Sequence, residues 1–328
     1  MSHALVYGGA DLGGTNIAAA VSDGEGRILA ETSVPTLSYE GPVPILARIG
    51  QAVLELAEEV DGRLAAVGVG LPGLIDLQRG LTLFMPNLPT NWRNVPARSA
   101  LEDQVKCPVA LLNDARIATL GELRFGLGRG VNTMVYLTLG TGIGGGLVVD
   151  GKLRLGLLGA AGELGHQTIL PDGPMCGCGN RGCVEALASG PAITAEGVRL
   201  LKSGLAPMLY DLTGGDPGRV TPKEMTEACR RGDAMVREAI RKAAAYLGIA
   251  IANVVTIIHP ELVVLTGGVA AMGDLLLNTI REEVDARVHM FPADTARIEV
   301  SSLSNRAGVL GGVALALDQY QASNTAAV

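Results

Sequence analysis

The most specific chemical signal in this 328-residue sequence is a group of one histidine and three cysteines. His166, Cys176, Cys178 and Cys183 lie within 18 residues, in a polar, glycine-rich stretch with little apolar mass to fold by itself. One imidazole and three thiolates form a ligand set typical of tetrahedral Zn²⁺, and four protein ligands leave no open position for water. The pattern therefore predicts a structural zinc site, with a set of inert thiols as the alternative.

Two carboxylates flank this group. Glu163 precedes His166 by three residues, and Glu185 follows Cys183 by two. A bound zinc ion would therefore fix both carboxylates in space. Carboxylate oxygens accept hydrogen bonds well from the paired hydroxyls of a sugar, whereas ordinary surface charge is the alternative explanation.

Two glycine-rich turns could bind phosphate. The first, D-L-G-G-T-N at residues 11–16, follows an apolar strand, and its backbone N–H groups would face phosphate oxygens while Asp11 holds Mg²⁺ or its waters. A plain hairpin turn is the alternative. The second, G-T-G-I-G-G-G at residues 140–146, contains G-x-G-x-x-G but continues as a strand, so the helix that a dinucleotide site requires is missing. We predict a second phosphate-facing hairpin there, and the lack of G-x-x-x-x-G-K-[ST] excludes a P-loop.

Asn113 and Asp114 follow the apolar strand V-A-L-L at residues 109–112. Ligands of α/β sheets gather at the carboxyl ends of strands. Asp114 could therefore act as a general base that accepts the proton of a hydroxyl group. The alternative is a residue that only caps the helix that follows.

The elements that must position these residues alternate between strands and helices. Apolar patterns and turn residues predict strands at 5–11, 16–23, 27–34, 65–71, 109–112, 133–139, 144–149, 262–265 and 297–301, and helices at 44–60, 96–105, 115–124, from 222, at 233–257, after 268 and at 308–319. Residues 200–219 show no clear pattern, and we expect a frayed tail after Gln321. The alternation indicates an α/β protein with a mixed sheet. Two strand–glycine-turn–strand units about 130 residues apart suggest a duplicated architecture.

Composition narrows the possible partners. A formal net charge of −7 argues against binding through nucleic-acid phosphates or anionic lipid, and 3% aromatic residues argue against a base-stacking platform. The uncharged stretches at 131–149 and 243–258 lack the character of membrane spans, and no targeting segment is visible. Five unevenly spaced cysteines do not form a disulfide pattern. We expect a soluble, cytoplasmic protein that contacts neither nucleic acid nor membrane.

Taken together, the motifs resemble the ROK family of sugar kinases, within the actin-like ATPase fold. The shared motifs are D-L-G-G-T-N at 11–16, G-L-P-G at 70–73, N-D-A at 113–115, L-G-T-G-I-G-G-G at 139–146, G-E-L-G-H at 162–166, C-G-C-G-N-R-G-C-V-E at 176–185 and T-G-G-V at 266–269. The resemblance implies a two-domain α/β fold of the actin-like ATPase type, a duplicated ribonuclease H-like fold with an interdomain cleft. It also implies a small domain at 1–115, completed by a C-terminal helix at 305–328, and a large domain at 116–304 that carries the zinc-binding loop.

The resemblance further implies a role for individual residues. Asp114 matches the family's catalytic base. Positions that match sugar contacts are Gly73, Asn87, Asn113, Glu163, His166 and Glu185, with His166 also serving the zinc. Positions that match contacts to ATP are Gly13, Gly14, Thr15 and Asn16 in the first turn, Thr141 and Gly142 in the second, and Gly267 and Gly268 near the nucleotide. Asp11 matches the acid associated with Mg²⁺.

The implied reaction is ATP-dependent phosphorylation of a hexose, with glucose at O6, a glucokinase activity, as the first choice. N-acetylglucosamine or N-acetylmannosamine kinase and fructokinase are alternatives, because the sequence does not show which side chains enclose C2 of the sugar. The expected cofactors are ATP, Mg²⁺ and structural Zn²⁺, and the resemblance alone suggests a homodimer or higher homo-oligomer.

The alternative outside the kinases is a catalytically inactive sugar sensor. Repressors of the same family would need a helix-turn-helix module before the first glycine turn, and only ten residues precede Asp11. The presence of Asp114 and both glycine turns leads us to expect an enzyme.

Overall fold

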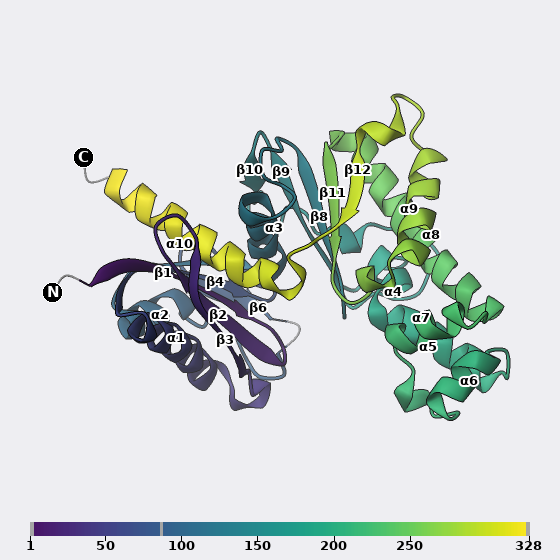
Figure 1. Cartoon of the computed structure of the whole chain (residues 1–328), viewed down its shortest axis with the longest axis horizontal. Coiled ribbons are helices and arrows are strands. Elements are labelled where there is room, and N and C mark those ends of the chain that lie inside the picture. The colour runs from purple at the N-terminus through teal and green to yellow at the C-terminus, as the bar shows by residue number, and fades with distance from the viewer. Residues whose placement is uncertain (1–2, 86–87, 326–328) are drawn as a thin grey trace. The chain divides into compact units, whose positions relative to one another are not determined.

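The computed structural model describes residues 3–85 and 88–325, and the chain forms two compact units (Figure 1). Unit 1 comprises Met1–Gly130, Leu147–Ala161 and Ser302–Val328, and unit 2 comprises Val131–Gly146 and Gly162–Ser301. The resemblance implies a different division, into a small domain at 1–115 and 305–328 and a large domain at 116–304. That division stays a prediction. Asn87, one of the predicted sugar contacts, lies outside the described residues.

Two five-stranded sheets share one topology. The first sheet has the order β3 (Ile28–Pro35), β2 (Asn16–Ser22), β1 (Ala4–Leu12), β4 (Gly62–Leu71), β7 (Val109–Asn113). In it, β3, β2 and β1 form an antiparallel meander, and β4 and β7 join in parallel. The second sheet has the order β10 (Lys152–Arg154), β9 (Ile143–Val149), β8 (Met134–Leu139), β11 (Leu262–Thr266), β12 (Arg297–Val300). In it, β10 pairs antiparallel with β9, and β8, β11 and β12 are parallel to one another. The matching orders confirm the predicted duplication and the α/β class with mixed sheets.

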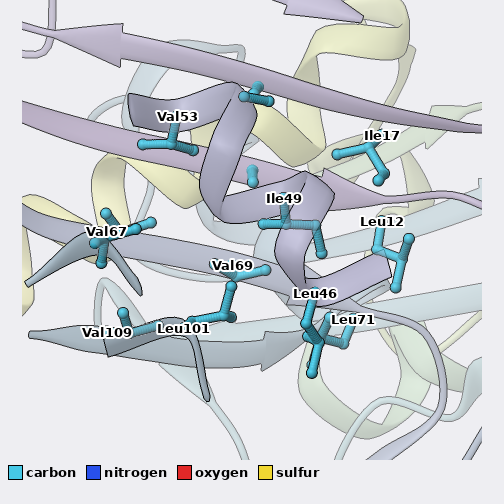
Figure 2. Packing of buried hydrophobic residues seen from close by; sticks show 14 of the residues in the cluster. Leu12, Ile17, Leu46, Ile49, Val53, Val67, Val69, Leu71, Leu101 and Val109 are labelled. Carbon is cyan, nitrogen blue, oxygen red and sulfur yellow. The ribbon is translucent and has the colours of Figure 1, made fainter. Parts of the chain in front are cut away.

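The main core of unit 1 lies between the first sheet and two helices, α1 (Pro42–Glu59) and α2 (Ala97–Val105) (Figure 2). Ile45, Ile49 and Val53 recur at helical spacing on α1 and are fully buried against the strands. Each such side chain contributes about 1.5–3 kcal/mol when it leaves water. This packing fixes the positions of β1 and β7, whose carboxyl ends carry the predicted catalytic residues.

The other face of the first sheet is covered by α10 (Ala307–Thr325), which also packs against α3 (Asp114–Phe125). Glycine makes a close approach possible there, because a Cβ atom at Gly68 would overlap the carbonyl oxygen of Gly312. A Cβ atom at Gly9 would likewise overlap the backbone of Val309. As a result, α10 rests directly on the sheet, and its first turn lies beside the end of β1.

Helices dominate unit 2. The long helix α8 (Ala234–Ile258) packs against α9 (Asp274–Asp285), and α4 (Val184–Ala188), α5 (Gly190–Lys202) and α7 (Pro222–Arg230) also contact α8. Thr221 caps α7 by accepting a hydrogen bond from the N–H of Lys223, which confirms the helix start predicted there. By length and composition α8 could cross a membrane, but 56% of its most apolar 18-residue window is buried inside the protein, as in a core helix.

Short elements escaped the sequence prediction. β5 (Leu74–Asp76) and β6 (Leu81–Phe84) form a small hairpin, and β10 has only three residues, too few for a periodic pattern. Within residues 200–219 the chain forms α6 (Pro207–Thr213), with proline in its first turn. The fraying predicted after Gln321 is wrong as far as Thr325, because α10 continues to that residue.

Candidate active site and metal centre

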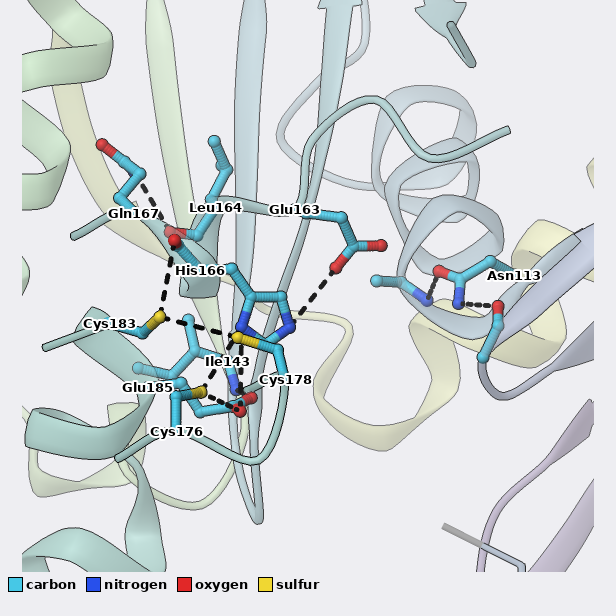
Figure 3. Close-up of polar contacts among 12 residues, drawn as sticks. Asn113, Ile143, Glu163, Leu164, His166, Gln167, Cys176, Cys178, Cys183 and Glu185 are labelled. Atoms are coloured by element: carbon cyan, nitrogen blue, oxygen red, sulfur yellow. Dashed lines mark hydrogen bonds and ion pairs between the residues drawn. The ribbon is translucent and has the colours of Figure 1, made fainter. Parts of the chain in front are cut away.

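Asn113 and Asp114 lie where β7 ends and α3 begins. Asn113 is the N-cap of α3, and its Oδ1 accepts hydrogen bonds from the N–H groups of Ala115 (3.0 Å) and Arg116 (3.4 Å). Its Nδ2 donates to the carbonyl oxygen of Gly73 (2.9 Å), and Figure 3 shows hydrogen bonds from both ends of this carboxamide. The cap of α3 is therefore Asn113 and not Asp114, for which that role is the alternative prediction, and the same bonds give the Asn113 side chain one fixed orientation.

Asp114 is the first residue of α3 and is partly exposed. Its Oδ1 accepts a hydrogen bond from the N–H of Ala115 (2.8 Å). A carboxylate at a helix N-terminus is stabilised by the helix dipole and held in place by such bonds. Asp114 thus has the position at a strand end, and the fixed geometry, that a general base requires.

Asp11 lies near the end of β1 and close to Asp114. Its Oδ1 is buried and makes no hydrogen bond within the described part of the chain. Burial, and next the negative charge of Asp114, raise the pKa of Asp11 to about 7. A Cβ atom at Gly70 would lie 2.8 Å from Oδ1, and one at Gly308 would overlap Oδ2. A buried carboxylate oxygen without a partner, beside a second acid, is a donor set that suits a hard cation such as Mg²⁺.

The first glycine turn, at residues 11–16, joins β1 to β2 in a hairpin. A hairpin turn is one of the two predictions for it, and a phosphate-binding turn is the other. The N–H of Gly13 donates to the carbonyl oxygen of Asn16 (3.0 Å), so this group is occupied by the turn itself. The N–H groups of Gly14 and Thr15 make no hydrogen bond within residues 3–85 and 88–325, and both residues are exposed. These two groups are the ones that the turn can offer to a phosphate.

The histidine and three cysteines form a compact cluster in unit 2 (Figure 3). One ligand atom from each of His166, Cys176, Cys178 and Cys183 lies within 4.8 Å of every other. Cys178 Sγ is 3.7 Å from Cys183 Sγ, and Cys176 Sγ is 3.7 Å from His166 Nδ1. Tetrahedral zinc with Zn–S bonds of about 2.3 Å requires sulfur–sulfur separations of about 3.8 Å. The cluster therefore fits the predicted ion.

Burial raises the pKa of the Cys176 thiol to about 12, while the backbone N–H of Asn180 lowers the pKa of Cys178. Thiols bind zinc as thiolates, so a cation at this cluster would have to displace the proton of Cys176. A buried thiol with a raised pKa is inert toward other chemistry at neutral pH. Cys176 is thus suited to holding a metal ion and unsuited to nucleophilic catalysis.

Glu185 connects this cluster with the second glycine turn. Its Oε2 accepts a hydrogen bond from the N–H of Ile143 (2.9 Å), and its Oε1 lies 3.6 Å from Cys176 Sγ. A Cβ atom at Gly142 would lie 2.6 Å from Oε2, so a larger residue there would have to displace the Glu185 carboxylate. The N–H groups of Thr141 and Gly142 make no hydrogen bond in the part of the chain that the structure covers. Sequence reasoning missed this bridge, because it joins residues 42 positions apart.

The remaining predicted residues of unit 2 lie around these features. Glu163 Oε2 is 3.9 Å from His166 Nε2, on the ring nitrogen opposite the one that faces Cys176. Gly267, at φ 93°, follows β11, where a Cβ atom would lie 2.5 Å from the carbonyl oxygen of Leu139. Gly268 is exposed and borders open space. A ligand could therefore reach the backbone at Gly268.

One further residue was not singled out by the sequence. Arg116, the third residue of α3, has only 1% of its surface exposed and donates from its Nη1 nitrogen to Asn113 Oδ1 (3.1 Å). A charged residue three positions after a helix cap would ordinarily be assigned to the helix surface. No sequence signal indicates its burial.

Comparison with known proteins agrees with this arrangement. The chain is 39% identical to the glucokinase of Thermotoga maritima over 314 residues, which cover 94% of this chain and 96% of that protein. Among solved structures, a ROK family glucokinase from Streptomyces griseus in complex with glucose and AMPPNP matches with a TM-score of 0.80 and 35% identity, covering 95% of this chain and 99% of the other. Both relatives extend over the two units.

Regulatory proteins are also similar to this chain. The xylose repressor of Caldicellulosiruptor bescii is 36% identical over 254 residues, covering 77% of this chain and 63% of the repressor. The ROK family model matches residues 7–319, a range that contains every predicted site residue from Asp11 to Gly268. Because this match spans nearly the whole chain and the glucokinase relative is covered almost completely, the chain belongs to the ROK family.

Proposed function

We propose that the chain is a glucokinase, which transfers the terminal phosphoryl group of ATP to O6 of glucose. The observation that carries this proposal is the position of Asp114, a carboxylate held by α3 at the end of β7 beside the buried Asp11. The glucokinase of Thermotoga maritima and the glucose–AMPPNP complex of the Streptomyces griseus enzyme support both the sugar and the donor.

On the sugar side, we assign the role of general base to Asp114. Its carboxylate would accept the proton of the 6-hydroxyl as that oxygen attacks phosphorus. Asn113 would hold the neighbouring part of the sugar. Glu163 and Glu185 would accept hydrogen bonds from further hydroxyls, since carboxylates are acceptors. His166 faces Cys176 with Nδ1, so with that nitrogen on zinc its Nε2–H would donate to a sugar oxygen. Gly73 would contribute indirectly, because its carbonyl oxygen fixes Asn113.

On the phosphate side, the backbone N–H groups that could bind phosphate are those with no hydrogen-bond acceptor among the described residues. Those of Gly14 and Thr15 in one turn and of Thr141 and Gly142 in the other would donate to phosphate oxygens. Asp11 would hold Mg²⁺ or its waters, and that ion would neutralise charge on the phosphates. Such donors stabilise the charge that develops during transfer without having to reorganise.

The histidine–cysteine cluster would hold a structural zinc ion. Its four ligands come from a loop with little apolar packing, so the ion would order that loop and, through Glu185, the glycine turn beside it. A cytoplasmic location accords with the five free cysteines, since thiols stay reduced there. Assembly into a homodimer also belongs to this proposal, and light scattering on the purified protein tests it.

A hexose panel tests the proposed activity. We would assay glucose, N-acetylglucosamine, N-acetylmannosamine and fructose with Mg·ATP and compare kcat/KM across the sugars. The expected result is the highest kcat/KM for glucose, with phosphate attached at O6 as read by a coupled glucose-6-phosphate dehydrogenase assay. A higher value for another sugar would contradict the assignment to glucose.

The similarity to a xylose repressor favours one second candidate, a sugar-binding protein without turnover. The same panel separates the two candidates if sugar binding is measured by calorimetry. Binding of a sugar without ATP consumption would favour the sensor and overturn the kinase.

A further inference from the structure

Arg116 is a buried cation at the edge of the proposed sugar site. Its Nη1 nitrogen donates to Asn113 Oδ1 (3.1 Å), and its Nε donates to the carbonyl oxygen of Ala161 (3.0 Å). Only 1% of the residue is exposed. The guanidinium therefore links the end of β7 to residue 161, which lies 45 positions later in the chain.

This position is unfavourable for an arginine on two counts. Arg116 is the third residue of α3, where the positive end of the helix dipole repels a cation and where glutamate or glutamine is the preferred capping partner. Removing a guanidinium from water is also costly, and buried ion pairs and charges return little net stability. The hydrogen bonds of Arg116 to Asn113 and Ala161 indicate that it orients these groups.

The bonds of Arg116 determine what Asn113 can do. Three donors converge on Asn113 Oδ1, namely the N–H groups of Ala115 and Arg116 and the Arg116 guanidinium. Because donors require an acceptor, this end of the carboxamide must be the oxygen, and the nitrogen must face Gly73. One of the two Nδ2 protons is used by the Gly73 carbonyl. The second proton has no acceptor among residues 3–85 and 88–325 and could serve a ligand, so Asn113 would meet a sugar hydroxyl as a donor.

We propose that Arg116 is a positioning residue for hexose binding, which acts by locking the carboxamide of Asn113 with its N–H directed to a sugar oxygen. This inference rests on the proposed hexokinase-type function and adds a residue to it. Arg116 itself does not have to contact the sugar. A bidentate link to Asn113 and Ala161 uses the planar guanidinium, which a lysine cannot reproduce.

The test is a double-mutant cycle between Arg116 and Asn113. Arg116→Met keeps the length and apolar character of the side chain but removes its donors, and Arg116→Lys keeps the charge. Asn113→Ser keeps an oxygen that can cap α3 but removes the amide donor. Arg124→Met is the matched control, because Arg124 lies on the same helix in an exposed pair with Asp318 (2.7 Å).

Glucose affinity is measured by calorimetry without ATP, and KM values for glucose and ATP are measured separately. We expect Arg116→Met to weaken glucose binding at least about tenfold, the usual effect of losing a hydrogen bond from a charged donor, with the KM for ATP changed less than about twofold. Arg116→Lys should give a smaller loss in the same direction. In the Asn113→Ser background, neither substitution should weaken glucose binding further.

Two results would overturn the inference. An unchanged glucose affinity in Arg116→Met would show that the hydrogen bond from Arg116 to Asn113 is not needed for glucose binding. Equal losses in the native and Asn113→Ser backgrounds would show a general structural effect. If Arg116→Met does not fold, the cycle with Arg116→Lys gives the same decision. Failure of the proposed function is distinguishable, since it would appear in the unmodified protein as a lack of sugar binding or of turnover.

Discussion

Replacing Asp11 with asparagine should change how the stability of the protein depends on pH. In the folded chain, burial of Asp11 and then the charge of Asp114 raise its pKa to about 7, from an ordinary value near 3.8. A folded-state pKa above the unfolded one means that the native protein holds a proton which the unfolded chain has released. The contribution to stability is fully present below the unfolded pKa and is lost as pH rises through the folded pKa.

The size of this effect follows from the two pKa values. Between pH 5 and pH 8 the folded protein loses a stabilisation of roughly two pKa units, or about 3 kcal/mol at about 1.4 kcal/mol per unit. The carboxamide in Asp11→Asn cannot titrate, so the variant should gain about that much stability relative to the native protein over this range. Any fixed cost of the buried amide is the same at every pH and cancels from the slope.

The assay is urea unfolding of both proteins at intervals from pH 5 to pH 8, without nucleotide. Asp103→Asn, an exposed aspartate on α2, serves as the control and should follow the native curve. The two stability curves, for Asp11→Asn and for the native protein, should diverge across this range. If they run parallel, the assigned burial of Asp11 and its coupling to the charge of Asp114 are refuted. Adding Mg·ATP should flatten the native curve, because a bound cation would keep Asp11 ionised.

Three further predictions concern other parts of the structure. Removing zinc with a chelator, or by Cys178→Ser, should lower the melting temperature and weaken glucose binding, whereas unchanged glucose affinity in metal-free folded protein would count against the zinc site. Gly308→Ala should raise the KM for Mg·ATP by displacing the Asp11 carboxylate, and no change in that constant would argue that Asp11 is not used. Thr221→Ala should cost about 1 kcal/mol of stability through loss of the α7 cap while kcat stays the same, as measured by urea unfolding and steady-state kinetics.

Features that depend on neighbours in the sequence were predictable. The meander of β1 to β3 was visible because apolar strands alternate with turn residues over short distances. The metal ligands were equally visible, because the three cysteines lie within eight residues and the histidine only ten residues earlier. In both cases the chain has little freedom to place such residues far apart.

Features that depend on distant contacts were not predictable. Whether the N–H of Gly13 is free depends on how the hairpin closes, and the carbonyl oxygen of Asn16 takes it. The burial of Arg116 depends on Ala161, and the link from Glu185 to Ile143 depends on how α4 packs beside a glycine turn. These contacts join residues that no local pattern relates.

The central claim is that Asp114 takes the proton from the sugar hydroxyl. Its most direct test is the value of kcat for Asp114→Asn with glucose and Mg·ATP, in protein shown by calorimetry to bind glucose. The asparagine keeps the shape of the side chain but cannot accept that proton, so kcat should fall by about a hundredfold to ten-thousandfold. A kcat within about twofold of the native value, with glucose still bound, would contradict the account.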